Sequence, residues 1–519
     1  MNSILPKITV CLIGGLLFLI TGCRQNNTPP VSQQPAAVAA TAIPTSPPAP
    51  TIPTAAPTAT QPPIPTMTPT VGPMAIPTMA GLPFANHKIG AGETLGYIAD
   101  SYDLPIEELV KLNKLSGADA IIQIDQSLRI PLADDMPQAP TEVVWPDSEV
   151  VYSPAYLDFD MAEFAKKQGG YLAQHTEMVD GEKLSGTEVI ARVSERFSVG
   201  PRVLLTLLEH YGEWVTNPHP AEALINAPLG PRNPMGGSLY LAAAWTAKKI
   251  NAGYYGYRRN GFWIHTLDDY KLVIAKTGLS AGTVGMQAIL AVHSDTETWQ
   301  KLNQPDGLMA EYKKLFGDPK KYALKGYVVP SNLTQPPMSL PWKKGQGFYL
   351  TAGPHAAYIE GSGWAAVDFG APDVLGNCFI SAEPNTAAAD GLILTARPGE
   401  VELDLDGDGK IQTGWVLMYL HAALDSETPV QVGQHVKTGD VIGYASCEGG
   451  EANASHLHFV RRYNGEWMDA DGPVPMNLSG WQFLPTTVEY DGKVQKGKVV
   501  RDSCECWKKD ENLLVNEDK

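Results

Sequence analysis

Two histidines separated by a single residue, in the run His456-Leu457-His458-Phe459, place the strongest constraint on the fold of this chain. Along a β-strand, residues i and i+2 point to the same side of the sheet. Both imidazoles therefore face one way, as the ligands of a metal site do. The sequence thus predicts a β-sheet that carries a metal centre on one face.

Three residues upstream can complete such a centre. His355, Asp368 and His421 supply two more imidazoles and a carboxylate. A catalytic zinc ion takes three protein ligands and keeps one position for water, whose pKa it lowers to about 7. The five residues can supply three metal ligands and two further groups that assist catalysis. We therefore expect hydrolysis by a zinc-activated water.

The order and spacing of these residues resemble those of the lysostaphin-like (LytM) zinc endopeptidases, whose core is similar to the run 432–443 followed by the two histidines. In the lysostaphin branch a His stands four residues before the Asp, and Trp364 occupies that position here. The β-lytic, staphylolysin-like branch places this His further away. His355 precedes Asp368 by 13 residues, which fits that branch.

The resemblance implies an antiparallel β-sheet peptidase domain over residues 341–487, in which His355, Asp368 and His458 bind Zn²⁺. His421 and His456 would stay unligated beside the metal. It implies that His456 is the base that orients the water and that His421 donates to the developing oxyanion; the reverse assignment stays open. The implied substrate is a peptide cross-link of peptidoglycan, either a Gly-Gly bridge or a D-Ala cross-link.

Two other functions stay open at this point. A catalytically inactive peptidase domain would make the chain a peptidoglycan-binding scaffold or an activator of other wall hydrolases, and Trp364 favours this hypothesis. A secreted bacteriolysin aimed at competing cells is the third hypothesis. The presence of His355, His421, His456 and His458 together favours an enzyme.

Residues 1–23 are typical of a secretory signal, because Lys7 precedes the short apolar run Ile8–Ile20. The run ends in Ile20-Thr21-Gly22-Cys23, which resembles a bacterial lipobox. That resemblance implies acylation of Cys23 and an extracytoplasmic protein that is lipid-anchored to the bacterial membrane and faces the cell wall. An ordinary signal with a chance cysteine is the alternative.

Residues 24–84 are rich in Pro and Thr and lack apolar periodicity, so we expect a disordered linker.

Residues 85–133 resemble a LysM module. A strand-like start at His87-Lys88-Ile89, apolar residues at helical spacing from Leu95 to Leu112, and a closing run Leu128–Pro131 predict a βααβ order. The resemblance implies binding of glycans that contain N-acetylglucosamine, in peptidoglycan or chitin. A module of this shape that binds a protein, or nothing, is the alternative.

Residues 150–335 repeat apolar residues at helical spacing and predict a mostly helical domain. The run 197–209 vaguely resembles the core of lysozyme-like transglycosylases, which implies Glu209 as a candidate acid. The Ser expected after that Glu is replaced by His210. A helical domain that binds glycan without cutting it, or a spacer, is the favoured alternative.

Asp404, Asp406 and Asp408 alternate in a run with a Gly in the sixth position, which is typical of the opening half of an EF-hand-like calcium loop. Trp415 stands where the bidentate Glu would belong, so complete EF-hand coordination is not expected. An exposed acidic turn between two strands explains the same pattern. The sequence leaves Ca²⁺ open as a second cofactor.

Composition limits the remaining possibilities. The formal net charge of −17 disfavours nucleic acid and anionic membrane surfaces as ligands, so contact with a membrane would depend on the lipid anchor. Outside the cytoplasm thiols can oxidise, and the first hypothesis is a Cys378–Cys447 disulfide, with Cys504 and Cys506 as the other two candidates. Residues 488–519 are expected to form a C-terminal tail, which is charged and irregular from Lys496 to Lys519. The fold class is multidomain α+β.

Overall fold

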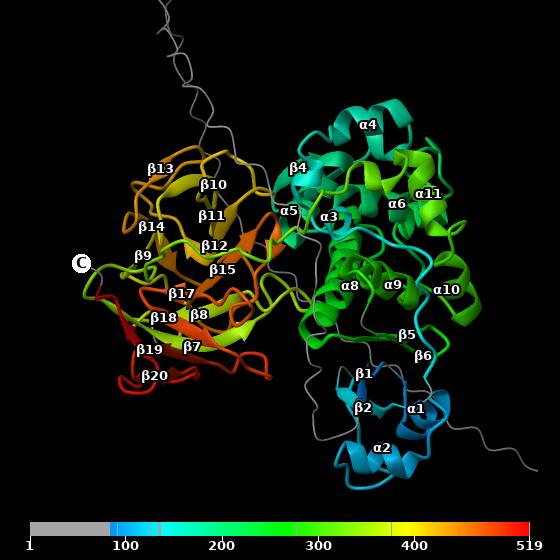
Figure 1. Ribbon diagram of the computed structural model, residues 1–519, viewed down its shortest axis with the longest axis horizontal. Helices are drawn as coiled ribbons and strands as arrows, with labels where there is room; N and C mark the ends of the chain where they lie inside the picture. The colour runs from blue at the N-terminus through cyan, green and yellow to red at the C-terminus, as the bar shows by residue number, and fades with distance from the viewer. Residues whose placement is uncertain are drawn as a thin grey trace, which may run out of the picture. The chain divides into compact units, whose positions relative to one another are not determined.

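A computed structural model of the chain describes residues 84–517 except 91, 125, 133–135, 277 and 375 (Figure 1). The predicted signal segment, Cys23 and almost all of the predicted linker lie outside the described residues. Among the residues that are described, no helix combines the length and the apolar character needed to cross a bilayer.

The first domain has the predicted βααβ order. Strand β1 (Phe84–Lys88) pairs antiparallel with β2 (Ser127–Pro131), and helices α1 (Leu95–Ser101) and α2 (Ile106–Leu112) lie between them in sequence. The Thr94 side chain caps α1 by accepting a hydrogen bond from the Tyr97 backbone N–H. The apolar residues at helical spacing, among them Ile98 and Leu109, are fully buried in a core of their own.

The middle domain is mostly helical, as predicted. Its elements are α3 (Asp147–Val150), η1 (Pro154–Tyr156), α4 (Met161–Gln168), η2 (Tyr171–Ala173), β3 (Thr176–Val179), β4 (Glu182–Ser185), α5 (Gly186–Phe197), α6 (Pro201–Gly212), α7 (Glu222–Asn226), α8 (Leu239–Asn260), β5 (Trp263–Thr266), β6 (Leu272–Ala275), α9 (Ala281–His293), α10 (Thr296–Leu302), α11 (Leu308–Phe316) and η3 (Pro319–Lys321).

The central helices of this domain, α8 and α9, approach each other through glycine. A Cβ atom on Gly253 of α8 would lie 2.5 Å from the Cβ of Ala288, and one on Gly285 of α9 would lie 2.8 Å from the Ile250 carbonyl oxygen. Such distances are shorter than van der Waals contact, so only glycine permits this packing. The two helices lie side by side in Figure 1.

The third domain contains an antiparallel sheet with the path β13-β10-β11-β12-β15-β8-β7-β21 (Figure 1). The strands of this sheet are β7 (Gly347–His355), β8 (Ala366–Gly370), β9 (Pro384–Thr386), β10 (Gly391–Arg397), β11 (Gly399–Asp404), β12 (Trp415–Ala423), β13 (His435–Val436), β14 (Val441–Ala445), β15 (Leu457–Tyr463), β16 (Glu466–Trp467) and β21 (Leu513–Val515). A smaller antiparallel sheet follows, made of β17 (Asn477–Leu478), β18 (Trp481–Leu484), β19 (Lys493–Lys496) and β20 (Val499–Asp502).

The two faces of the large sheet pack against different cores. Phe459 of β15 and its partner Tyr419 of β12 belong to the core of the third domain itself. The next pair, Val460 and Met418, points to the opposite face and joins the hydrophobic core of the helical domain. Because side chains alternate along a strand, His458 shares the face of Val460. The predicted ligands therefore lie beside the surface that packs on the helices.

The expectation of an irregular C-terminal tail over residues 488–519 is wrong for much of that segment. Residues 493–502 form the β19–β20 hairpin, and β21 joins the edge of the large sheet by pairing with β7. Val494 and Leu514 are fully buried. Short alternating apolar positions among charged residues give a weak strand pattern, and burial against distant strands decides the outcome.

Candidate metal centre

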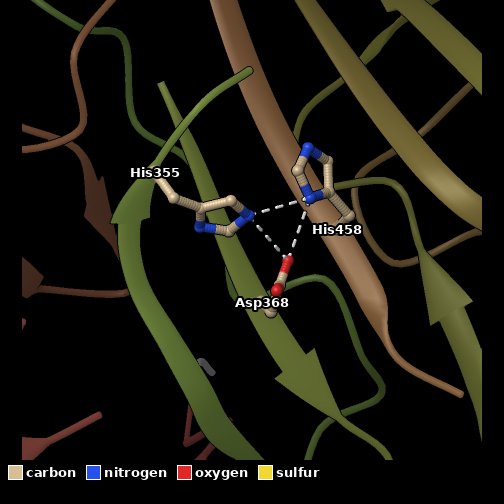
Figure 2. Close-up of side chains that lie close together, drawn as sticks. All are labelled: His355, Asp368 and His458. Carbon is tan, nitrogen blue, oxygen red and sulfur yellow. Dashed lines mark hydrogen bonds and ion pairs between the residues drawn. The ribbon is translucent and has the colours of Figure 1, made fainter. Parts of the chain in front are cut away.

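The three predicted ligands converge on one point of the sheet (Figure 2). His458 Nδ1 lies 3.0 Å from Asp368 Oδ1, and His355 Nε2 lies 3.4 Å from the same oxygen. The two ring nitrogens are 3.1 Å apart. One oxygen and two nitrogens at this spacing can share a single cation, and all three residues are buried.

Strand register brings these residues together. Asp368 of β8 and His458 of β15 are direct cross-strand partners, so their side chains leave the same face of the sheet next to each other. His355 ends β7, where the pairing with β8 shifts register between Ala352 and His355. A bulge of this kind redirects a side chain, and here it turns the His355 ring toward the other two ligands.

Backbone carbonyls fix which nitrogen of each ring faces the centre. His355 Nδ1 donates to the Gly353 carbonyl at 2.8 Å, and His458 Nε2 donates to the Ala357 carbonyl at 2.8 Å. A carbonyl can only accept, so the remaining nitrogen of each neutral ring carries the lone pair. Metal-binding histidines are usually held in this way. Two imidazole nitrogens and one carboxylate oxygen fit Zn²⁺ and leave a position open for water.

The charges around Asp368 suit a cation. Burial alone would raise the pKa of Asp368, but the positive charge that His355 and His456 carry when protonated outweighs burial and holds this pKa well below its usual range. Burial lowers the pKa of His458. The carboxylate is therefore ionised while the His458 ring favours its neutral, metal-binding form.

The two remaining histidines stand next to this cluster. The rings of His421 and His456 have centroids 4.5 Å apart, and His456 Nε2 lies 3.6 Å from Asp368 Oδ1. Each ring donates its Nδ1 proton to a backbone carbonyl, Glu448 for His421 and Ala454 for His456, both at 2.8 Å. Burial lowers the pKa of His421 to about 4. His421 also has a φ of +58°, a conformation that non-glycine residues rarely adopt and that recurs at functional sites.

Trp364, at the position of the lysostaphin-type His, contacts the helical domain. The guanidinium of Arg259, on α8, lies 3.6 Å from the centre of its ring. The Trp364 carbonyl accepts a hydrogen bond from the Ala470 N–H at 2.8 Å. The position thus joins the sheet to the helical domain, and the imidazole that lies beside Asp368 is that of His355.

Sequence reasoning missed two residues beside the cluster. The Tyr490 ring stacks on His355, with centroids 4.6 Å apart and planes 19° apart. Glu489 accepts a hydrogen bond from the Ala356 N–H at 3.1 Å. Both lie in the segment that was predicted to be the C-terminal tail, and no local motif marks them.

The acidic loop between β11 and β12 gathers its carboxylates as a calcium loop would. Ligand atoms of Asp404, Asp406 and Asp408 lie within 4.8 Å of one another. Burial raises the pKa of Asp404 to about 6. Hydrogen bonds within the loop, such as Gly409 N–H to Asp404 at 2.9 Å, also explain this geometry as an acidic turn.

The other predicted residues have structural contacts. Cys378 is bonded to Cys447, which is the disulfide that the sequence analysis put first, and Cys504 is bonded to Cys506. That these thiols are oxidised in the cell stays a prediction. Glu209, at the end of α6, accepts hydrogen bonds from the Val215 and Thr216 backbone N–H groups at 2.9 and 3.0 Å. These bonds fasten the turn after α6, and the role of Glu209 as an acid stays untested.

An antiparallel sheet with a buried His-Asp-His cluster and two adjacent imidazoles is the fold and site of a metal-dependent hydrolase. Comparison with known families narrows this class. Residues 87–131 match the LysM domain, residues 143–330 match "LasA, N-terminal domain", and residues 379–470 match "Peptidase family M23". The last match includes His421, His456 and His458 and begins after His355 and Asp368.

The chain is also similar to individual proteins. Protease LasA of Pseudomonas aeruginosa (strain UCBPP-PA14) is 24% identical over 340 residues, which are 60% of this chain and 73% of the relative. Among solved structures, the M23 metalloprotease pseudoalterin is 19% identical, with a TM-score of 0.26, and the match covers 33% of this chain and 96% of that one. The catalytic domain of lysostaphin from Staphylococcus simulans is 27% identical, with a TM-score of 0.17, over 25% of this chain and 89% of that one.

The chain therefore carries LysM, LasA N-terminal and M23 peptidase domains, and it is homologous to protease LasA. It is a peptidoglycan-degrading zinc metallopeptidase.

Removal of His458 should abolish zinc binding. The His458→Ala variant leaves one imidazole and one carboxylate, too few ligands for a stable zinc site. We expect zinc content, measured by plasma mass spectrometry, to fall to background together with muropeptide cleavage. His435→Ala, at an exposed position of β13 at the far end of the same sheet, should keep both. Full zinc content and activity in His458→Ala would contradict the ligand assignment.

Proposed function

We propose that His355, Asp368 and His458 hold the zinc ion with which this chain cuts the peptide cross-links of peptidoglycan. The observation that carries the proposal is the convergence of His355 Nε2, Asp368 Oδ1 and His458 Nδ1 on one buried point. Bound there, zinc would polarise a water molecule and a peptide carbonyl and would lower the pKa of that water to about 7.

His421 and His456 are proposed to move the protons. With Nδ1 donated to a carbonyl, each neutral ring offers the lone pair of Nε2 as a proton acceptor. A ring that has accepted a proton becomes a donor to the developing oxyanion or to the leaving amine. His456, 3.6 Å from Asp368, is proposed as the base and His421 as the donor, and the reverse assignment fits the same contacts.

The intact ligand set supports an enzyme over an inactive scaffold. The scaffold hypothesis depended on Trp364, which stands in place of a ligand His. The Trp364 ring packs against the Arg259 guanidinium, and His355 is proposed to supply the imidazole. The bond that is cut, a Gly-Gly bridge or a D-Ala cross-link, is to be read from the products of a muropeptide digest.

Replacing either unligated histidine should separate catalysis from metal binding. We expect His421→Ala and His456→Ala to keep zinc, because neither ring belongs to the ligand set, and to lose roughly 10²–10⁴-fold in turnover. Muropeptide release by liquid chromatography, beside zinc content by plasma mass spectrometry, checks both. Turnover within twofold of wild type in both variants, roughly the scatter expected of surface changes, would remove them from the mechanism.

The LysM domain is proposed to hold the enzyme on N-acetylglucosamine-containing glycan. The domain has a buried core of its own, in which Leu95, Leu109 and Leu128 take part. A fragment of residues 80–135 should therefore remain bound to purified cell wall after washing. Recovery of the whole fragment in the unbound fraction would refute the targeting role.

Cys23 is proposed to carry a lipid that anchors the chain to the bacterial membrane on the side that faces the wall. The proposal is supported by the lipobox-like run 20–23 after an apolar segment. Radioactive palmitate should label the wild-type chain and not a Cys23→Ala variant. No label on either chain would favour simple secretion, and equal labelling of both would exclude Cys23 as the acylated residue.

Asp404, Asp406 and Asp408 are proposed as a calcium site of incomplete EF-hand type. Oxygen ligands at this spacing suit Ca²⁺, although the twelfth position lacks a carboxylate. Added calcium should raise the melting midpoint at fixed zinc concentration, and Asp406→Asn should reduce the shift. An unchanged midpoint in the wild type would leave the loop as an acidic turn.

A further inference from the structure

A groove in the helical domain lies between α4 and α11, and the peptidase mechanism does not use it. Its volume is about 560 Å³, within the usual range for small-ligand sites. In Figure 1 both helices lie at the same end of the helical domain, where η1 and η3 also contribute to the groove.

Aromatic rings form one wall of this groove. Phe164 of α4 stacks on Phe316 of α11, with centroids 4.7 Å apart and planes 28° apart. Phe159 packs against both, at 5.7 and 5.9 Å. Phe159 and Phe164 remain partly exposed, so apolar ring surface is available inside a hollow. Such surface suits a ligand with an apolar face.

The floor of the groove is rigid and electrically neutral. Arg202, which is 2% exposed, lies between the rings of Tyr156 and Tyr322, 4.0 and 4.2 Å from their centres. Its guanidinium donates to the fully buried carboxylate of Glu149 at 2.6 and 3.0 Å. A buried pair that is bonded in this way holds its geometry, so the groove exists before a ligand arrives.

The rim carries charges of both signs. Asp158, Asp160 and Glu163 stand on it with Lys167 and Lys321, and all five are exposed. Near balance of charge disfavours a strongly anionic or cationic ligand. Carboxylates and ammonium groups around an aromatic wall instead suit hydroxyl and amide groups on a ligand whose C–H face stacks on the rings.

We propose that this groove binds a glycan strand of peptidoglycan, as a second carbohydrate site besides the LysM domain. An N-acetylated sugar has the required features: an apolar face, many hydroxyl groups and no net charge. The proposal builds on the action of the chain at the cell wall and depends neither on the zinc centre nor on the LysM domain. The helical domain would then hold glycan while the neighbouring domain cuts the peptide.

Photo-crosslinking to the full-length chain tests this site directly. A chitotetraose that carries a diazirine is irradiated with the protein, and labelled peptides are mapped by mass spectrometry. We expect label in segments 154–167 and 315–324, displaced by excess unlabelled chitotetraose. Label confined to the LysM residues 87–131, or absent from both groove segments, would overturn the proposal.

Two groove variants and a matched control sharpen the result. Phe164→Ala should reduce groove labelling about tenfold, because it removes a stacking surface. Asp158→Ala with Glu163→Gln should also reduce it severalfold while it leaves the aromatic packing intact. Asp306→Ala with Glu297→Gln removes two exposed carboxylates of the same domain outside the groove and should change nothing. Unchanged groove labelling in both groove variants would also overturn the proposal.

Failure of the glycan site and failure of the peptidase assignment give different results. Cleavage of a soluble peptide substrate needs only the zinc centre, so the groove variants should cleave it at the wild-type rate. LysM labelling in the same sample shows that the probe is active, and cleavage of the soluble peptide shows that the peptidase sheet, which packs on the core of the helical domain, is folded. Loss of groove label with both of these intact is the expected outcome.

Discussion

The cross-strand pairing of Asp368 with His458 is the constraint on which the site depends. A register shift of one residue between β8 and β15 would turn one of these side chains to the opposite face and separate the ligands. The register is held because Phe459 and Val367 are buried on the other face, in the core of the peptidase domain. Hydrophobic burial on one side of the sheet therefore fixes the metal geometry on the other.

The same sheet face serves two purposes. Val460 packs into the core of the helical domain, and His458, two residues earlier on the strand, belongs to the metal cluster. The segment between His355 and Asp368 also contacts both the metal cluster and the helical domain. The Ala357 carbonyl accepts a hydrogen bond from His458, and the Ala357 side chain is buried in the core of the helical domain. One short loop therefore packs against the helical domain and also orients the His458 ring.

Local patterns were enough to predict which residues form the His-Asp-His cluster but not what surrounds it. The two-residue period of an extended chain places His456, which immediately precedes β15, and His458 on one face. The spacing in the resembling family selects His355 over Trp364. Tyr490 and Glu489 reach the cluster only through the C-terminal sheet, whose short strands depend on long-range burial that a sequence pattern does not carry. The contact of Arg259 with Trp364 likewise requires two domains to be folded together.

Anomalous X-ray diffraction at the zinc absorption edge, on crystals of the purified chain, tests the central claim most directly. We expect one strong peak bonded to His355 Nε2, Asp368 Oδ1 and His458 Nδ1, with metal–ligand distances of about 2.0–2.2 Å. The absence of a peak at this position from crystals grown with zinc, or a peak held by other residues, would contradict it.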